Sequence, residues 1–190
     1  MAYQSFSTNT RKRTTPRIQY VKGYLGQASV QGQESLPIYN SQAILSGMCI
    51  SRVYDDGQWK WQRGHVAGNQ PFVAHQDYTD PDVVASGKLT GMLLTPGGIE
   101  FRTGHILLGT EANWDAGAKV SAVLFDNGTA ADRGKFKLAA SGEDIIGQLA
   151  GAHKDGLIDV ASENTEVTPV SGVVAVAQIQ GAFVTGNTMA

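Results

Sequence analysis

Residues 42–62 read QAILSGMCISRVYDDGQWKWQ, and this stretch determines the fold class. Gln42 to Val53 is a long run compatible with a β-strand, and Asp55-Asp56-Gly57 is a strong signal for a tight hairpin turn. The letters QWKWQ that follow alternate strictly between apolar and polar residues. This alternation places Trp59 and Trp61 on one face of a second strand. The stretch therefore predicts a β-hairpin.

The rest of the chain repeats this pattern of short strands separated by turns. Turn signals recur roughly every ten residues, for example at Pro96-Gly97-Gly98 and Asp126-Asn127-Gly128. Such a series is typical of a β-sandwich or a small β-barrel, and the pattern does not distinguish the two. Further strands are expected within Val83–Thr95, Ile99–Arg102, Lys119–Phe125, Lys135–Ala139 and Val173–Val184.

Very little helix is expected. The best candidate is Asp80 to Ser86, where Asp80 is a suitable N-cap and Pro81 fits the first helical position. The predicted fold class is therefore all-β, with a β-sandwich or small β-barrel body and an extended N-terminal arm.

Charge is distributed unevenly along the chain. The net charge is −2, from 15 basic and 17 acidic residues. The first 22 residues contain five basic and no acidic residues, a charge of +5, and the remainder therefore carries −7. An asymmetry of this kind is typical of a segment that binds an acidic partner. The five cations are Arg11, Lys12, Arg13, Arg17 and Lys22.

We interpret residues 1–40 as an extended basic arm that becomes ordered on a partner. The segment is rich in Ser, Thr, Asn and Gln, and Pro16 disfavours a helix at Thr15. Its apolar side chains are spaced singly, which suits docking into grooves but not a core. The alternative is a terminal tail without a role. The residues expected to contact the partner are Phe6, Arg11, Lys12, Arg13, Arg17, Ile18, Tyr20 and Lys22.

Length and composition suit a folded body beyond the arm. With 190 residues, 42% of them hydrophobic and only 17% charged, the chain is not globally disordered. We expect β-rich lobes at 41–115 and 116–190, or one domain over 41–190. Cys49 is the single cysteine, which excludes an internal disulfide framework. We see no signal-peptide run and no apolar run of the about 20 residues that span a membrane.

The sequence contains no recognised catalytic motif. The G-x-S-x-G element of serine hydrolases and the G-x-G-x-x-G fingerprint of dinucleotide-binding proteins are both missing. Its histidines lack the spacing of metal-ligand motifs. We therefore expect no enzymatic activity, no cofactor and no metal. The four histidines are His65, His75, His105 and His153.

Two features leave a choice between a structural and a functional interpretation. Trp59 and Trp61 would form a stacking platform for sugars or bases if exposed, and half of a core face if buried. The acidic run Asp77–Asp82 offers oxygen ligands for calcium. The more common arrangement is a loop whose Asp80 caps a short helix.

Several segments resemble the decoration, or cement, proteins of tailed bacteriophage capsids. The resemblance covers residues 41–185. It rests on a strand entered through Ser46-Gly47-Met48, on a strand followed by a D/N-G turn and an I-G-x-[AVL] step, and on a closing strand. The segments concerned are Gly117–Phe125 with Asp126-Asn127-Gly128, Ser141–Leu149 (SGEDIIGQL) and Val173–Val184.

The resemblance implies a non-enzymatic virion protein on the outer capsid surface. It would be made in the host cytoplasm, form trimers or dimers, and bind the major capsid protein where its subunits meet. One alternative is a tail or fibre module whose Trp59/Trp61 face binds a host glycan, and another is a hydrolase built on carboxylates. No membrane contact is expected. Direct nucleic-acid binding is disfavoured because the charge of −7 beyond the arm would repel phosphate.

Overall fold

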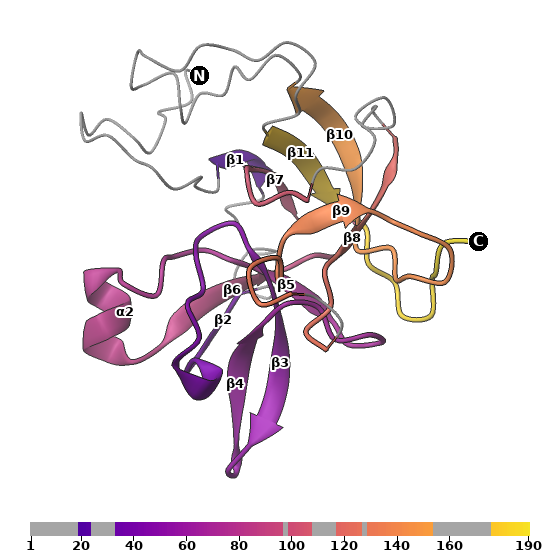
Figure 1. Cartoon of the computed structure of the whole chain (residues 1–190). Coiled ribbons are helices and arrows are strands. Elements are labelled where there is room, and N and C mark those ends of the chain that lie inside the picture. Colours follow the sequence, from indigo (N-terminus) through magenta and orange to yellow (C-terminus); the bar gives the residue numbers. More distant parts are fainter. Residues whose placement is uncertain (1–18, 24–32, 97–98, 108–116, 127–128, 154–175) are drawn as a thin grey trace.

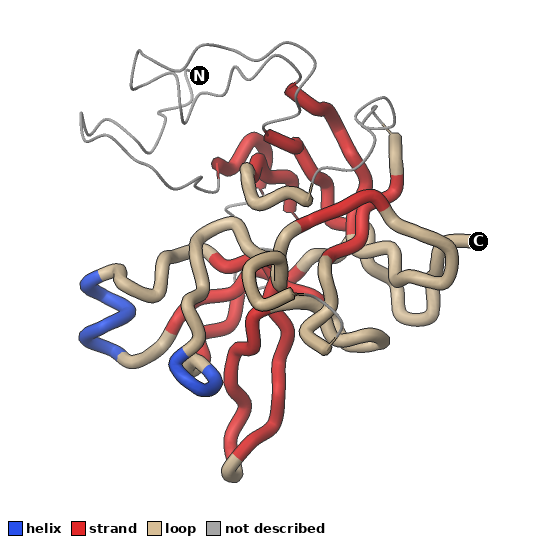
Figure 2. Tube along the Cα trace, viewed as in Figure 1, coloured by secondary structure: helices blue, strands red, loops and turns tan. Residues whose placement is uncertain are grey.

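The computed structural model describes residues 19–23, 33–96, 99–107, 117–126, 129–153 and 176–190. These residues form two antiparallel sheets with almost no helix (Figures 1 and 2). Sheet A contains, in spatial order, β1 (Gln19–Gly23), β7 (Ile99–Thr103), β11 (Val176–Gly181), β10 (Gly147–His153), β8 (Lys119–Ala122) and β9 (Phe136–Leu138). Sheet B contains β2 (Gln33–Leu36), β6 (Leu89–Leu93), β5 (Pro71–Ala74), β3 (Cys49–Asp55) and β4 (Gln58–Arg63).

The main core lies between the two sheets. Alternation along β7 turns Ile99 and Phe101 inward, as the sequence predicts, and both are buried. They pack in one cluster with side chains from sheet B, among them Val73 and Met92. Because both sheets are open among the described residues, the body is sandwich-like and the barrel alternative is not observed. The all-β prediction is confirmed.

A second, smaller core covers the outer face of sheet B. Trp61 is completely buried there, and its indole Nε1–H donates to the carbonyl oxygen of Leu89 at 2.7 Å. The indole lies so close to β6 that a Cβ atom at Gly91 would stand 2.6 Å from its Cζ2 atom. Glycine at this position therefore lets the large ring cross the strand. The cluster comprises Ile44, Ile50, Trp61, Phe72, Ala74, Val83 and Leu89.

The short helix α2 (Pro81–Ser86) contributes Val83 to this second core. Its start is as the sequence predicts, with Pro81 in the first turn and the Asp80 carboxylate accepting the Asp82 N–H at 3.0 Å. A 3₁₀ turn, η1 (Tyr39–Ser41), is the other helical segment described. None of the described helices has the length and apolarity needed to cross a membrane.

The outer edge of β4 is partly covered by the chain just before η1. Ile38 forms an isolated parallel bridge with Trp61, and the Trp61 backbone N–H donates to the carbonyl oxygen of Pro37 at 2.7 Å. Two residues further along β4, the backbone N–H of Arg63 donates to the side-chain oxygen of Gln42 at 2.7 Å. This cover ends at Trp61, so the part of β4 nearest the hairpin turn lies beyond it.

The first strand expected from the sequence starts later than predicted. Residues 42–48 are not strand, and β3 begins at Cys49. Gly47 has a φ of +90°, its N–H donates to the carbonyl oxygen of Ala74, and Met48 closes a turn onto Leu45. This turn delays the strand. Ile44, the residue before this turn, packs in the second core and is not part of a strand.

Two expected boundaries do not coincide with the arrangement of the strands. Residues 33–36 fall within the expected arm of residues 1–40, but they form β2 and pair with β6 in sheet B. The expected lobe boundary near residue 115 lies after β7 in the chain, yet β7 pairs with β11. Strands from before and after that point therefore share sheet A.

Candidate functional site

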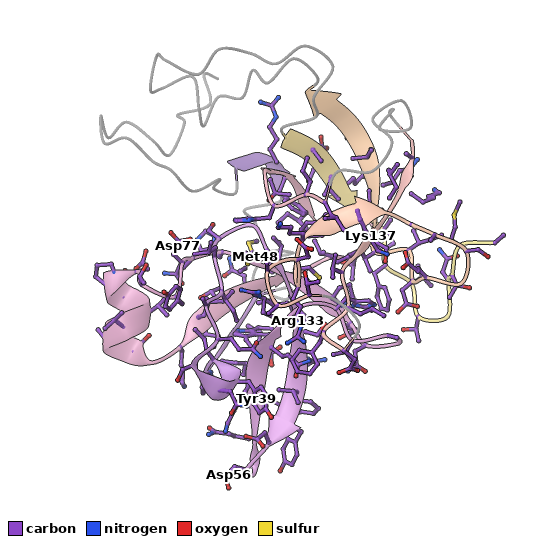
Figure 3. The ribbon with its side chains drawn as sticks, viewed as in Figure 1. Tyr39, Met48, Asp56, Asp77, Arg133 and Lys137 are labelled. Atoms are coloured by element: carbon purple, nitrogen blue, oxygen red, sulfur yellow. The ribbon has the colours of Figure 1, made fainter. Side chains whose placement is uncertain are left out.

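The hairpin of β3 and β4 extends beyond the rest of sheet B. The two strands pair from Ile50–Arg63 to Asp55–Gln58, whereas β5 pairs with β3 only as far as Ser51. Residues 53–60 therefore project as a two-stranded ribbon, with Asp56 at its far end (Figures 1 and 3). Asp56 and Gly57 have φ angles of 48° and 76°. These left-handed angles are those of the predicted two-residue hairpin turn.

The two tryptophans of β4 have different environments although they share one face. Trp61 is buried, with its ring centroid 4.8 Å from that of Phe72. Trp59, two residues nearer the turn, is 48% exposed. Of the two alternatives left open by the sequence, burial in a core holds for Trp61 and exposure holds for Trp59, so the two rings do not form one stacking platform. Trp59 alone remains available to a partner.

Trp59 is held in place by two neighbours. Its cross-strand partner Tyr54, itself 62% exposed, makes an edge contact with ring centroids 5.2 Å apart. The guanidinium carbon of Arg52 lies 5.5 Å from the Trp59 ring centroid and 5.4 Å from that of Phe72. These contacts link the exposed ring to the second core. We refer to Arg52, Tyr54 and Trp59 as the hairpin surface.

The two cations at the hairpin surface, Arg52 and Lys60, are paired. Arg52 bonds to the Glu34 carboxylate at 3.4 Å and to the Gln70 side-chain oxygen at 3.0 Å. Lys60 donates to Asp55 at 2.7 Å, and this hydrogen bond raises the pKa of the Lys60 ammonium. The pairing offsets the charges of these two cations, and Asp56 places a further carboxylate at the turn.

Most residues of the predicted arm site lie outside the described part of the chain. Tyr20 and Lys22 fall in β1, where they stand opposite Phe101 and Glu100 of β7, with a register shift between them. β1 is an edge strand of sheet A and lies at the other end of the body from the hairpin turn (Figure 1). The undescribed residues of that site are Phe6, Arg11, Lys12, Arg13, Arg17 and Ile18.

The acidic run Asp77–Asp82 serves backbone capping. Asp77 accepts the backbone N–H of Ser46 at 2.7 Å, and Asp80 caps α2. The described residues contain no group of three or more histidine, cysteine or acidic side chains able to hold a metal ion. The capping interpretation of this loop is therefore confirmed.

Sequence reasoning missed a buried histidine–carboxylate pair. His65 Nε2 lies 2.7 Å from an oxygen of Asp144, which also accepts the Gly68 N–H at 2.8 Å. A histidine beside a carboxylate is common at catalytic sites. Here the His65 side chain is completely buried, and that of Asp144 is 9% exposed. The pair joins the loop after β4 to the segment before β10.

The cross-strand aromatic pair of the hairpin surface follows from the sequence. A turn centred on Asp56 and Gly57 makes Tyr54 and Trp59 cross-strand neighbours, whereas alternation along the second strand relates only the two tryptophans. No known family model matches this chain, and no curated protein matches it either. The assignment of a function therefore depends on the chemistry of the two surfaces, the arm and the hairpin.

Proposed function

We propose that this protein is a structural, non-enzymatic component of a phage virion that binds the outer surface of the capsid and bridges neighbouring major capsid subunits. The observation that carries the proposal is the separation of charge: +5 in the first 22 residues and −7 in the rest. The resemblance of residues 41–185 to capsid decoration proteins supports the same assignment.

The described chain begins at the edge of a sheet, directly after the four clustered cations of the arm. Gln19 begins β1, which is an edge strand of sheet A among the described residues. Arg11, Lys12, Arg13 and Arg17 lie within nine residues of that point in the sequence. Cations placed there suit an acidic patch on an adjacent subunit, and repetition over a lattice of sites adds avidity. A trimer or dimer of the protein would multiply these contacts.

Deletion of residues 1–18 tests the proposal while leaving β1 intact. We expect the shortened chain to keep the melting temperature of its body and to lose co-sedimentation with purified shells that lack this protein. A full-length control with Arg11, Lys12, Arg13 and Arg17 replaced by Gln separates charge from length. Undiminished attachment of both variants would contradict a role for the arm.

The glycan-binding alternative has less support. It required Trp59 and Trp61 to form one exposed face, and Trp61 is buried. A single exposed tryptophan on a projecting ribbon does not form the concave pocket in which small ligands are usually held.

A further inference from the structure

The hairpin surface has the composition of a protein-binding hot spot. Trp, Tyr and Arg are the residue types most often found to dominate protein interfaces. Here one of each is gathered on a single face of a ribbon, and two of them are large aromatic rings left substantially in water. Covering these rings would remove apolar area from water, which is the main favourable term in protein association.

The surface is also ordered before any partner arrives. Trp59 contacts both the Arg52 guanidinium and the Tyr54 ring, and Arg52 is itself hydrogen-bonded to Glu34 and Gln70. Immobilising a side chain on binding costs on the order of 0.5–1.5 kcal/mol. A ring that is already fixed avoids most of this cost.

Shape and charge limit the kind of partner that fits. The ribbon projects from the body, so it suits insertion into a groove and not enclosure of a small ligand (Figure 1). Its cations Arg52 and Lys60 are paired with Glu34 and Asp55. The surface therefore has little to offer a polyanion such as nucleic acid. A groove with an apolar floor, and with a cation near the carboxylate of Asp56, would complement it.

We infer that the hairpin surface is a second capsid-attachment point, which docks into an apolar groove on a major capsid subunit. This inference rests on the proposed function. The ribbon and β1 lie at opposite ends of the body, so attachments made at these two ends can reach different subunits (Figure 1). That arrangement would bridge the subunits through one body.

Salt separates the two attachments experimentally. Ion pairs between exposed groups weaken as the Debye length falls from about 10 Å at 0.1 M to about 3 Å at 1 M salt. Apolar contacts do not weaken in this way. Binding of the full chain to shells in high salt should therefore depend mainly on the hairpin.

The test compares the double variant Tyr54→Thr/Trp59→Thr with a matched control, Val84→Thr. Threonine preserves strand propensity in the ribbon, and Val84 is an apolar residue of α2 that is 68% exposed. Full-length proteins are titrated onto purified shells that lack this protein, in about 0.1 M and about 1 M NaCl. In high salt we expect the double variant to bind at least about tenfold more weakly than the parent, and the control to bind like the parent. Unchanged melting temperatures show that the variants are folded.

Each other result counts against the inference. If the parent binds shells and the double variant binds equally well at both salt concentrations, the hairpin is not an attachment point, while the proposed function stands. If the parent binds no shell at either concentration, the proposed function fails and the inference fails with it. If the double substitution changes only self-association in sedimentation velocity, or only binding to a glycan array, the occupant is a second copy or a sugar and the inference is wrong.

Discussion

The inner and outer halves of the β3–β4 hairpin share one strand pattern and have opposite environments. Trp61 lies in the inner half and is part of the second core, and Trp59 lies two residues away on the same face in contact with solvent. The difference comes from the neighbouring strands, because β5 accompanies β3 only as far as Ser51. Alternation determines which face a residue occupies, and the reach of adjacent strands determines whether that face is covered.

The two halves are therefore expected to differ in what they contribute. The inner half stabilises the body through buried area and through the indole hydrogen bond to Leu89. The outer half contributes little to stability and presents side chains to a partner. The predictions below test this division.

The largest expected effect is at Trp61. Trp61→Ala removes a completely buried ring and leaves the Leu89 carbonyl without its donor. We expect the free energy of unfolding to fall by about 3–5 kcal/mol. Trp59→Ala should change it by no more than about 1 kcal/mol. Urea unfolding curves measure both variants, and equal losses would contradict the division between the halves.

A buried polar pair should likewise contribute more to the free energy of unfolding than a partly exposed pair does. Asp144→Ala leaves the buried His65 Nε2 and the Gly68 N–H without their acceptor, which should cost about 2–3 kcal/mol of unfolding free energy. Glu34→Gln weakens the partly exposed pair with Arg52 and should cost less than about 1 kcal/mol. Denaturant titration of the two variants gives the comparison. A larger loss for Glu34→Gln would show that the ribbon itself supports the fold.

A third test concerns the strand crossing beneath Trp61. Gly91→Ala places a methyl group against the indole, and we expect a loss of about 1–3 kcal/mol in unfolding free energy. Because the clash is with the large ring, the loss should shrink in a Trp61→Phe background. A double-mutant cycle measures this coupling. Additive losses would mean that Gly91 is required for another reason.

The smallest expected effect is the pH dependence due to His75, which follows β5 at the margin of the second core. Burial lowers the pKa of His75 below its ordinary value of 6.5, and Asp80 partly opposes this. The unfolded chain therefore gains a proton at a higher pH than the folded chain. Stability should decrease as the pH falls from about 6.5 through the folded pKa.

The variant His75→Gln isolates this contribution. We expect its unfolding free energy to fall less steeply than that of the parent between about pH 7 and about pH 5. Parallel stability curves for the two proteins would show that His75 is as well solvated in the folded state as in the unfolded one.

Local features of the fold could be predicted from the sequence because neighbouring residues determine them. The turn at Asp56-Gly57, the alternation of β4 and β7, and the Asp80 cap of α2 all follow this rule. The late start of β3 escaped prediction because the segment from Ile44 is recruited to a core that residues remote in the sequence complete.

The candidate sites were less predictable for the same reason. Whether Trp59 and Trp61 are exposed depends on strands and loops that no local pattern specifies. The pairing of His65 with Asp144 joins residues 79 positions apart. The arm residues were chosen for charge and spacing, and of these the structure describes only Tyr20 and Lys22, as positions in β1.

Because Pro37 and Ile38 cover part of the edge of β4, they limit edge-to-edge association between molecules. A bare sheet edge is a template on which strands of other molecules add, and such addition leads to fibres. The Pro37 carbonyl already accepts the Trp61 N–H, and proline has no N–H to offer an incoming strand. Sheet B is therefore capped along the inner part of this edge, as far as Trp61. Copies packed at high local density are protected there from polymerising edge to edge.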